Sequence, residues 1–481
     1  MKIYLTFLIS SLLLMSSCDS YLNLKPKNKT VVGTMEDVKL MMSSYLFSMS
    51  ASSSYPISFN RTTMTWPFNR DALACFAHYS DDVKMSLAVR NHYGKKYEKE
   101  YYENVDWKGW MFSELMWKRM YLHIGYLNSV LKSLSELSEY DQAEFERVKG
   151  EALTIRAYFI FKLLQYYAPY KNNELGIPLN LDPEVIDGPK RLTQKACYSQ
   201  ILGDLNEALG YEGQETAWNV FYSKNVLYAL LAQVYQFKAE SAAGESGDWE
   251  NAEKYSSFIV DKYRLETSTA EIKQMFSPAD GGVFYKDNNF ALRIFGWNIT
   301  PRSNTSAFWG YVGAGQYPAD DLLTSYDAGD IRYEAWFDTE EKEYNKYTYK
   351  TWVIADYVVL FRVADMYLIC AEANARLNRD KGKILLETFK KSRIPGFTSL
   401  TGGNVLDEVM LERRKEFCCE YDMRWLDMKR MGYTITREGV NEKSQQVNTY
   451  TLRGDDYRYA LPIPIESELT YNKIEQNPGW N

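Results

Sequence analysis

The side chains best suited to chemistry in this chain are aromatic rings that stand beside amide and charged groups in stretches without helical period. Tyrosine and tryptophan rings can stack on the flat C–H faces of sugars, while nearby amides, carboxylates and guanidinium groups bond the hydroxyls. Two regions combine these types, around residues 104–110 and 297–311, and a third surrounds Trp66. The candidate ligand-binding residues are Trp66, Trp107, Trp110, Trp297, Arg302, Asn304, Trp309 and Tyr311.

Tryptophan is also highly buried on average, so each of these rings has an alternative role. It would hold its loop onto the body of the protein without touching a ligand. Four other tryptophans lie in helical patterns, and we expect them in the core: Trp117, Trp218, Trp249 and Trp425.

The residues that usually bind metals are sparse. The chain has three histidines, no HExxH pattern, no CxxC spacing and no EF-hand loop, which argues against a zinc hydrolase and gives no metal or cofactor site. Beyond Cys18, an odd number of cysteines remains, so they cannot all pair within the chain. Cys197 and Cys370 lie among apolar helical positions, where we expect small buried hydrophobes.

Paired carboxylates are the remaining catalytic option, since a glycoside hydrolase needs two of them about 5–10 Å apart across a cleft. The pairs Asp81-Asp82, Asp320-Asp321 and Asp455-Asp456 are adjacent in sequence, so their side chains point apart. Helix capping is the better explanation for Asp320. We therefore expect no catalytic residue, although a surface hydrolase and a pure protein-interaction scaffold remain alternatives to a binding protein.

The first eighteen residues predict where the chain works. Lys2 precedes an apolar run over residues 3–15, and Ser16 and Ser17 lead to Cys18. A helix of that length reaches only about 20 Å, too short for a bilayer core of about 30 Å, so the segment is typical of a cleaved secretory signal. The cysteine at the cut suggests a bacterial lipoprotein lipidated at Cys18. The alternative is an ordinary secreted protein in which Cys18 has no such role.

Net charge and hydropathy limit the classes of partner, nucleic acid and membrane, that we expect for this chain. Removing residues 1–17 takes away one lysine, which moves the formal charge from -7 to -8. This mild acidity gives no reason to expect nucleic acid. No later stretch is long and apolar enough for a membrane span, so lipid would be the anchor, through acyl chains that each contribute about 0.8 kcal/mol per buried methylene.

Helical periodicity dominates the rest. Apolar residues recur every three or four positions over 148–166 and 226–237, and the second stretch has two apolar rows, as in a helix packed between other helices. Residues 228–259 reproduce the large-small-large spacing of a tetratricopeptide helix pair, with an insertion between the helices. Ala157 and Ala371 mark further degenerate first helices. Such pairs bury their apolar faces only by stacking.

The predicted fold is therefore mostly α: stacked tetratricopeptide-like helix pairs forming a single frame, decorated by long ordered loops with a few short strands. Residues 1–17 form the signal peptide, residues 18–33 a lipidated tether, and residues 34–481 a single domain. The loop regions are about 50–110, 170–193, 276–350 and 430–462, and their aromatic content argues against disorder.

Four segments, taken in order, resemble the SusD/RagB family of outer-membrane nutrient-binding lipoproteins. They are Cys18 with YLNLKPK, QYPADDLLTSYDAGDIRY (316–333), FRVADMYLICAEANARLN (361–378) with ERRKEFCCEYDMRWLDMKRMG (412–432), and YALPIPIESELTYNKIEQNPGW (459–480). The chain departs from the family pattern at FKKSRIPGFT (389–398), which lacks the usual Arg-rich turn, and at Cys418-Cys419.

The resemblance implies a non-enzymatic, lipid-anchored protein at the cell surface. It would bind an oligosaccharide, or a peptide as in some members, and deliver it to a SusC-like TonB-dependent transporter in the outer membrane. In this family the ligand-facing aromatic residues tend to come from the regions that hold Trp107 and Trp309.

Glu412, Glu416 and Glu420 lie one helical turn apart on one face, where like charges repel by about 0.2–0.5 kcal/mol per pair. We expect a partly buried salt network here, with Arg413, Arg414 or Arg424 as candidate partners, and not a catalytic cluster. Pro462, Pro464 and Gly479 predict an extended C-terminal clasp.

Overall fold

The computed structural model describes most of the chain, in segments separated by gaps. The described residues are 32–49, 58–59, 62–64, 67, 76–77, 79–85, 107, 111–185, 190–211, 222–276, 293–298, 316–338, 346, 357–420, 422–440 and 447–480.

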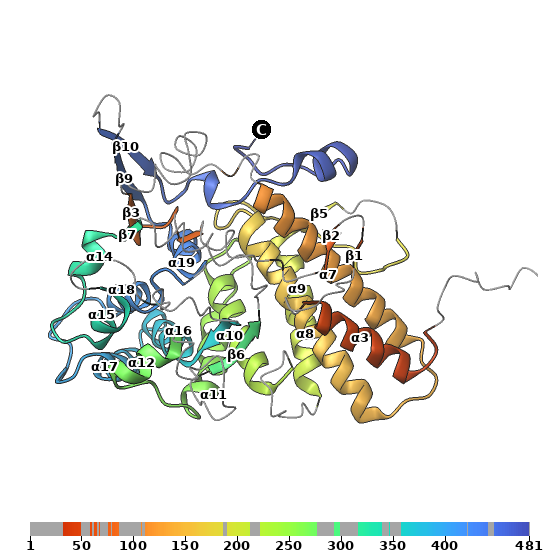
Figure 1. The fold of residues 1–481 in the computed structure, drawn as a ribbon, viewed down its shortest axis with the longest axis horizontal. Coiled ribbons are helices and arrows are strands. Elements are labelled where there is room, and N and C mark those ends of the chain that lie inside the picture. Colours follow the sequence, from red (N-terminus) through yellow and green to blue (C-terminus); the bar gives the residue numbers. More distant parts are fainter. Residues whose placement is uncertain are drawn as a thin grey trace, which may run out of the picture.

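Helices stack side by side through most of the described structure (Figure 1). Each packs on the next in the order α7, α8, α9, α10, α11, α16 and α17, with α18 also on α16 and α3 on α7 and α8. The predicted frame of helix pairs is confirmed. Its members are α3 (Met35–Met49), α7 (Met111–Ser135), α8 (Gln142–Tyr167), α9 (Gln194–Gly210), α10 (Lys224–Ala239), α11 (Asp248–Val260), α16 (Val363–Arg376), α17 (Lys381–Arg393), α18 (Val405–Phe417) and α19 (Met423–Met431).

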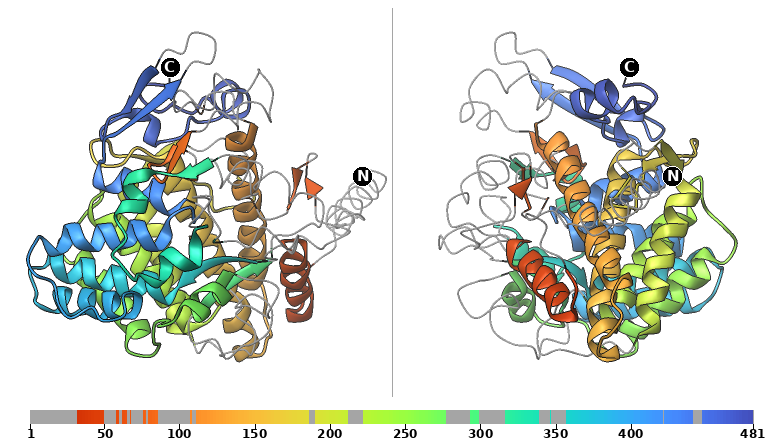
Figure 2. Two further views of the ribbon diagram at one scale, coloured as in Figure 1. Left: turned by 60° about the vertical axis from the view of Figure 1, so that its left-hand side comes forward. Right: turned by 90° about the vertical axis from the view of Figure 1, so that its right-hand side faces the viewer.

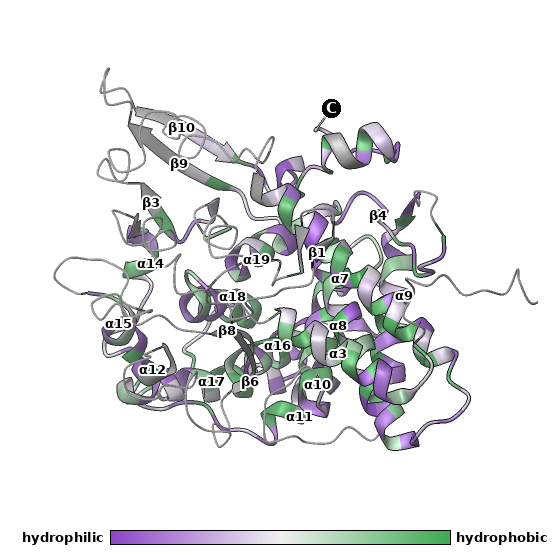
Figure 3. Ribbon diagram, turned by 45° about the vertical axis from the view of Figure 1, so that its right-hand side comes forward, coloured by the Kyte–Doolittle hydropathy of each residue, from purple (hydrophilic) through white to green (hydrophobic). Residues whose placement is uncertain are grey.

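Helix α8 forms the centre of the frame because other elements enclose it from residue 150 to its end. Asp141 caps its first turn by accepting a hydrogen bond from the Glu144 amide at 2.9 Å, and it ends two residues before Pro169. Every residue from 150 to 167 is buried. Apolar segments are prominent on α8, α10 and α16 (Figure 3).

The repeat-like pair predicted at 228–259 is the antiparallel pair α10–α11. The rings of Tyr235 and Tyr255 stack across it, with centroids 5.8 Å apart. Cys197 and Cys370 are buried as expected, the first on α9 and the second on α16.

The strands of the described segments form two-stranded antiparallel pairs. The β9–β10 pair projects away from the helices, and β3–β7 joins segments more than 200 residues apart (Figures 1 and 2). The pairs are β1 (Ser58–Phe59) with β2 (Thr62–Thr63), β3 (Val83–Met85) with β7 (Gln316–Pro318), β4 (Leu175–Pro178) with β5 (Arg191–Thr193), β6 (Arg293–Asn298) with β8 (Tyr357–Arg362), and β9 (Ile435–Val440) with β10 (Val447–Leu452).

A second, smaller core lies beside the frame. It is centred on Trp336 and Leu322, and Cys418 and Cys419 pack into it from the end of α18. Its helices are α12 (Thr269–Phe276), α14 (Asp320–Thr324) and α15 (Ile331–Trp336).

The C-terminal segment closes over the end of α8, as the clasp prediction requires. The backbone amide of Leu461 donates to the carbonyl oxygen of Tyr166, 2.8 Å away. The side-chain amide of Asn477 donates through Nδ2 to the carbonyls of Tyr167 and Leu461, at 2.7 and 2.8 Å. The clasp contains the short helices η2 (Tyr457–Tyr459) and η3 (Ile465–Tyr471).

Candidate functional site

Trp107 is a core residue, so the prediction that its ring faces a ligand is wrong. Its side chain is 1% exposed, and its Nε1 donates to the carbonyl of Arg458 at 3.0 Å. The ring packs edge-on against Tyr79 and Trp425, with centroids 4.8 and 5.5 Å away. The alternative role considered above, a ring that holds its segment onto the frame, is the one the structure shows.

The other predicted ligand-binding residues are not placed against one another by the structure. Trp297 lies in β6, where its backbone pairs with Val358. Trp66, Trp110, Arg302, Asn304, Trp309 and Tyr311 lie outside the described residues. Of the tryptophans expected in the core, Trp117 and Trp425 are buried, Trp249 packs half-buried against the core, and Trp218 lies outside the described residues.

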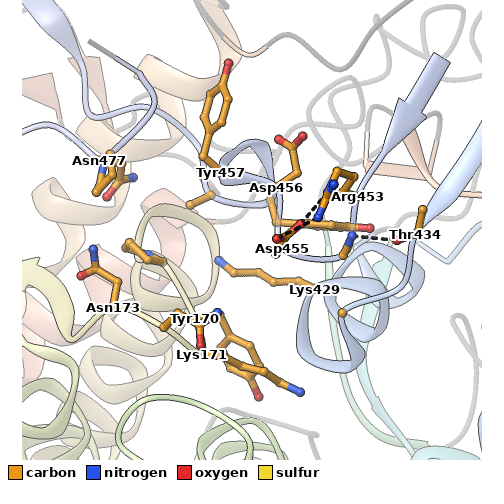
Figure 4. Close-up of a pocket in the computed structure, with 17 residues that line it drawn as sticks. Tyr170, Lys171, Asn173, Lys429, Thr434, Arg453, Asp455, Asp456, Tyr457 and Asn477 are labelled. Atoms are coloured by element: carbon orange, nitrogen blue, oxygen red, sulfur yellow. Dashed lines mark hydrogen bonds and ion pairs between the residues drawn. The ribbon is translucent and has the colours of Figure 1, made fainter.

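The described residues do form a pocket, of about 720 Å³, where the end of α8 meets α19 and the clasp (Figure 4). Its volume falls in the usual range for small-molecule sites, about 300–1,000 Å³. Its walls come from distant parts of the sequence: Pro169–Asn173, Lys429, Gly432, Thr434, Arg453–Tyr457, Tyr459, Ala460, Asn477 and Pro478.

Two glycines shape one wall. Gly432 ends α19 in the left-handed conformation, with φ of 68°, which a residue with a side chain rarely adopts. Gly454 lies directly against it, since a Cβ on Gly454 would be 1.9 Å from the Gly432 carbonyl oxygen. The Gly454 amide also donates to the Thr434 hydroxyl at 3.0 Å. This close approach joins the ends of β9 and β10 to α19.

Tyr457 is the exposed aromatic ring of the pocket, with 45% of its surface accessible. Its ring packs edge-on against Trp480, with centroids 5.0 Å apart, and lies against Gly479. Tyr170 and Tyr459 are buried, and each donates its hydroxyl to a backbone carbonyl at 2.6 Å. Tyr457 therefore offers a ring that is already held in place.

The acidic pair of the pocket is neutralised by arginines. Asp455 bonds Arg453 at 3.1 Å, and this bond lowers the pKa of the Asp455 carboxyl. Burial raises the pKa of Asp456, but hydrogen bonds from Arg458 outweigh it, so the net shift is downward. Both carboxylates are ionised and paired, which suits hydrogen bonding to hydroxyls better than proton transfer.

Lys429 reaches into the pocket from α19 and is only 4% exposed. In Figure 4 its side chain runs between Tyr170 and Tyr457. Its Nζ donates to the carbonyls of Gln165 and Ala168, both at 2.7 Å, at the carboxyl end of α8. Burial lowers the pKa of this amine to about 7. Sequence reasoning missed Lys429, because nothing in its local pattern separates it from a surface lysine.

The three glutamates of α18 and its end form a buried salt network, as predicted, but with other partners. Glu412 bonds Arg332 at 2.6 Å, Glu416 bonds Arg393 at 2.9 Å and Arg362 at 2.9 Å, and Glu420 bonds Arg362 at 2.8 Å. Burial raises the pKa of Glu412 and of Glu416, yet the cations that face them outweigh it: the pKa of Glu412 falls to about 2, and that of Glu416 lies well below its ordinary value.

The proposed partners Arg413, Arg414 and Arg424 bind elsewhere, which corrects the prediction. Arg413 pairs with Asp365 and Asp427, at 2.8 and 2.9 Å. Arg424 pairs with Asp81 at 2.6 Å, and Arg414 pairs with Asp321 at 2.8 Å and Asp82 at 3.4 Å.

The remaining acidic pairs are thus structural where the chain is described. Asp81 and Asp82 fasten the segment before β3 to α18 and α19. The capping role expected for Asp320 is wrong, because Ala319 is the N-cap of α14 and Asp320 stands one residue inside the helix.

Within the described segments, no group of three or more His, Cys, Asp or Glu side chains is arranged to hold a metal ion. The same segments contain no helix with the length and hydropathy needed to cross a bilayer.

Two family models together match most of the chain. One, described as the SusD family, matches residues 280–480, and the other, described as "Starch-binding associating with outer membrane", matches residues 21–236. No curated protein matches the sequence.

Solved structures share the fold. A putative sugar binding protein from Bacteroides vulgatus is 20% identical with a TM-score of 0.71, covering 94% of this chain and 100% of that one. A SusD superfamily protein from the same species is 21% identical with a TM-score of 0.71, over 93% and 100%. The surface glycan-binding protein A from Bacteroides fluxus is 16% identical with a TM-score of 0.63, over 93% and 100%.

Proposed function

The chain belongs to the SusD family, and on this basis we propose that it is a cell-surface lipoprotein that binds oligosaccharide and passes it to a TonB-dependent transporter. Lipidation at Cys18 would hold it to the outer membrane, and the SusC-like transporter would lie beneath it. It would bind its ligand without cleaving it.

The observation that carries the proposal is the pocket at the end of α8. It presents one exposed ring, Tyr457, beside amide, carboxylate and guanidinium groups. Trp480 holds the ring, and ion pairs with arginines hold the carboxylates. A sugar needs this combination, because its C–H face stacks on the ring while its hydroxyls bond the polar groups. Because the groups are held before binding, little conformational entropy is lost when a sugar binds.

The aromatic loops would extend this surface. Trp110, Trp297, Trp309 and Tyr311 remain proposed ligand contacts, together with Trp66, Arg302 and Asn304. Trp107 is not among them, because the core encloses it.

A glycan array probed with residues 19–481 tests the proposal, and calorimetry on the best ligand follows. We expect Tyr457→Ala to weaken binding by about 1–3 kcal/mol, as for other aromatic anchors. Tyr140→Ala is the matched control: Tyr140 is 44% exposed, also an aromatic ring on the surface, and precedes the opposite end of α8.

Binding of peptides and of no glycan would overturn the carbohydrate assignment. Release of new reducing ends from a bound glycan would overturn the non-enzymatic assignment. If both tyrosine variants bind as the wild type does, Tyr457 is not part of the site.

A further inference from the structure

Lys429 differs from every other buried lysine of the described segments. Lys162 pairs with Asp422 at 2.8 Å, and Lys238 pairs with Asp248 at 2.8 Å. Lys346 pairs with Glu420 at 2.6 Å, while Lys390 and Lys415 both pair with Glu412, at 3.4 and 3.1 Å. For Lys429 the described part of the chain supplies only the two carbonyls at the end of α8.

A buried ammonium without a carboxylate is costly, because burial removes water and nothing of opposite charge replaces it. The partial negative charge at the end of α8 compensates only in part. An ammonium has three N–H donors, and the two carbonyls use two of them. Lys429 lines the pocket, so a molecule bound there is placed to accept the third hydrogen bond and to supply the missing negative charge.

We propose that the pocket binds its oligosaccharide through an acidic sugar, whose carboxylate or sulfate group pairs with the Lys429 ammonium. This inference rests on the proposed function and names the class of glycan. The anion accepts the third hydrogen bond of the amine and supplies the charge that the other buried lysines obtain from aspartate or glutamate.

The surrounding charges permit an anion. The groups around the pocket are Lys171 on the loop after α8, Arg453, Asp455 and Asp456 on the turn after β10, Arg458 on η2, and the phenols of Tyr170, Tyr457 and Tyr459. Asp455 and Asp456 are already bonded by Arg453 and Arg458. The two acids therefore leave no unpaired negative charge to repel a ligand.

Other polar groups of the wall suit the rest of an acidic sugar. Asn172, Asn173 and Thr434 line the pocket together with Lys429. A uronic acid or sulfated sugar carries hydroxyls for these amide and hydroxyl groups as well as an anionic group for Lys429, whereas an isolated carboxylate carries no hydroxyl.

The test compares ligands that differ only in charge. Calorimetry at pH 6.5 would measure an oligogalacturonide against the same oligosaccharide after reduction of its carboxyl groups, and a sulfated oligosaccharide against its unsulfated parent. We expect at least one acidic form to bind about tenfold tighter than the neutral form, a difference of about 1.4 kcal/mol, because only the acidic form gives the Lys429 ammonium a charged partner. Lys429→Met should abolish this preference, and Lys195→Met, at an exposed surface lysine, should keep it.

A second measurement needs no variant and so does not depend on folding. NMR of 13C-labelled lysine follows the Lys429 Cε resonance through a pH titration, and a bound anion should raise the pKa of the amine above its low value in the free protein. The sulfated and uronic acid arms then identify which anion the pocket takes.

The outcomes separate the two proposals. If neutral and acidic glycans bind equally, or if Lys429→Met keeps the preference, the acidic-sugar inference fails while glycan binding stands. An unchanged Lys429 pKa in the acidic complex overturns the inference as well. If none of these glycans, nor any on the array, binds, the proposed function itself fails and the inference fails with it.

Discussion

Replacing Glu412 by Gln should destabilise the protein strongly, although the two side chains have nearly the same shape. Glu412 is buried on α18, where its carboxylate bonds Arg332 at 2.6 Å and also faces Lys415 and Lys390, at 3.1 and 3.4 Å. Glutamine keeps one acceptor but removes the negative charge. The three cations then remain buried with less compensation.

The magnitude follows from the pKa of the carboxyl. Burial raises it, but Arg332 and the two lysines together lower it from 4.5 to about 2. By linkage, this fall corresponds to about 3 kcal/mol of stability, and removal of one partner of a buried pair costs about 3–5 kcal/mol in general. Because the folded-state pKa is lowered, the stabilisation is fully present above pH 4.5 and is lost as the pH falls toward 2. At pH 3.5 about 2 kcal/mol of it should remain.

Urea unfolding followed by tryptophan fluorescence would measure the difference between wild type and Glu412→Gln at pH 7 and pH 3.5. Glu334→Gln is the control, because its ion pair with Lys273 at 3.4 Å is exposed and should contribute less than about 0.5 kcal/mol. Equal effects of the two substitutions at pH 7, or a Glu412 effect that grows as the pH falls, would refute the reasoning.

Two further predictions concern Trp107 and the proposed lipid anchor. Trp107→Ala should lower the free energy of unfolding by about 3–5 kcal/mol, because it empties a site between Tyr79 and Trp425; an unchanged urea midpoint would show that the ring is not part of the core. Cys18→Ala should release the full-length chain from membranes into the soluble fraction, since the lipid is the proposed anchor; a variant that still sediments with outer membrane in cells lacking the transporter would rule out lipidation as the anchor.

Local sequence pattern was sufficient for the helices of the frame. The apolar rows of 148–166 and 226–237 follow directly from helical geometry, and they became α8 and α10. The repeat-like spacing over residues 228–259 was equally local, and it correctly predicted the pair α10–α11.

Partners distant in sequence could not be predicted in the same way. The glutamates of 412–420 needed cations on one side, but Arg332, Arg362 and Arg393 come from other elements, and the nearest of them in sequence is 19 residues before Glu412. The arginines next to them in sequence point along other faces of the helices and bind other acids. Periodicity identified the charged face and not what lies opposite it.

Trp107 shows the same limit. The amide and charged groups of the 104–110 region suggested an exposed loop. The groups that bury the Trp107 ring are instead Tyr79, Trp425 and the carbonyl of Arg458, the last of them 351 residues away in sequence. Polarity of adjacent residues says little about a side chain that is large enough to reach a core assembled from the whole chain.

Asn477 belongs both to the pocket wall and to the clasp, so ligand binding and closure of the clasp are linked. Lys429 ties α19 to the end of α8, and Asn477 ties the clasp to Tyr167, so two residues of the pocket wall hold two different segments to α8. If opening the clasp removes Asn477 from the wall and abolishes binding, a ligand at 100 times its dissociation constant stabilises the closed clasp against opening by about 2.7 kcal/mol. Hydrogen exchange at the 460–480 backbone should slow when a ligand occupies this pocket, whereas a ligand held only by the aromatic loops should leave it unchanged. Exchange in this segment thus distinguishes the two proposed binding surfaces without any substitution.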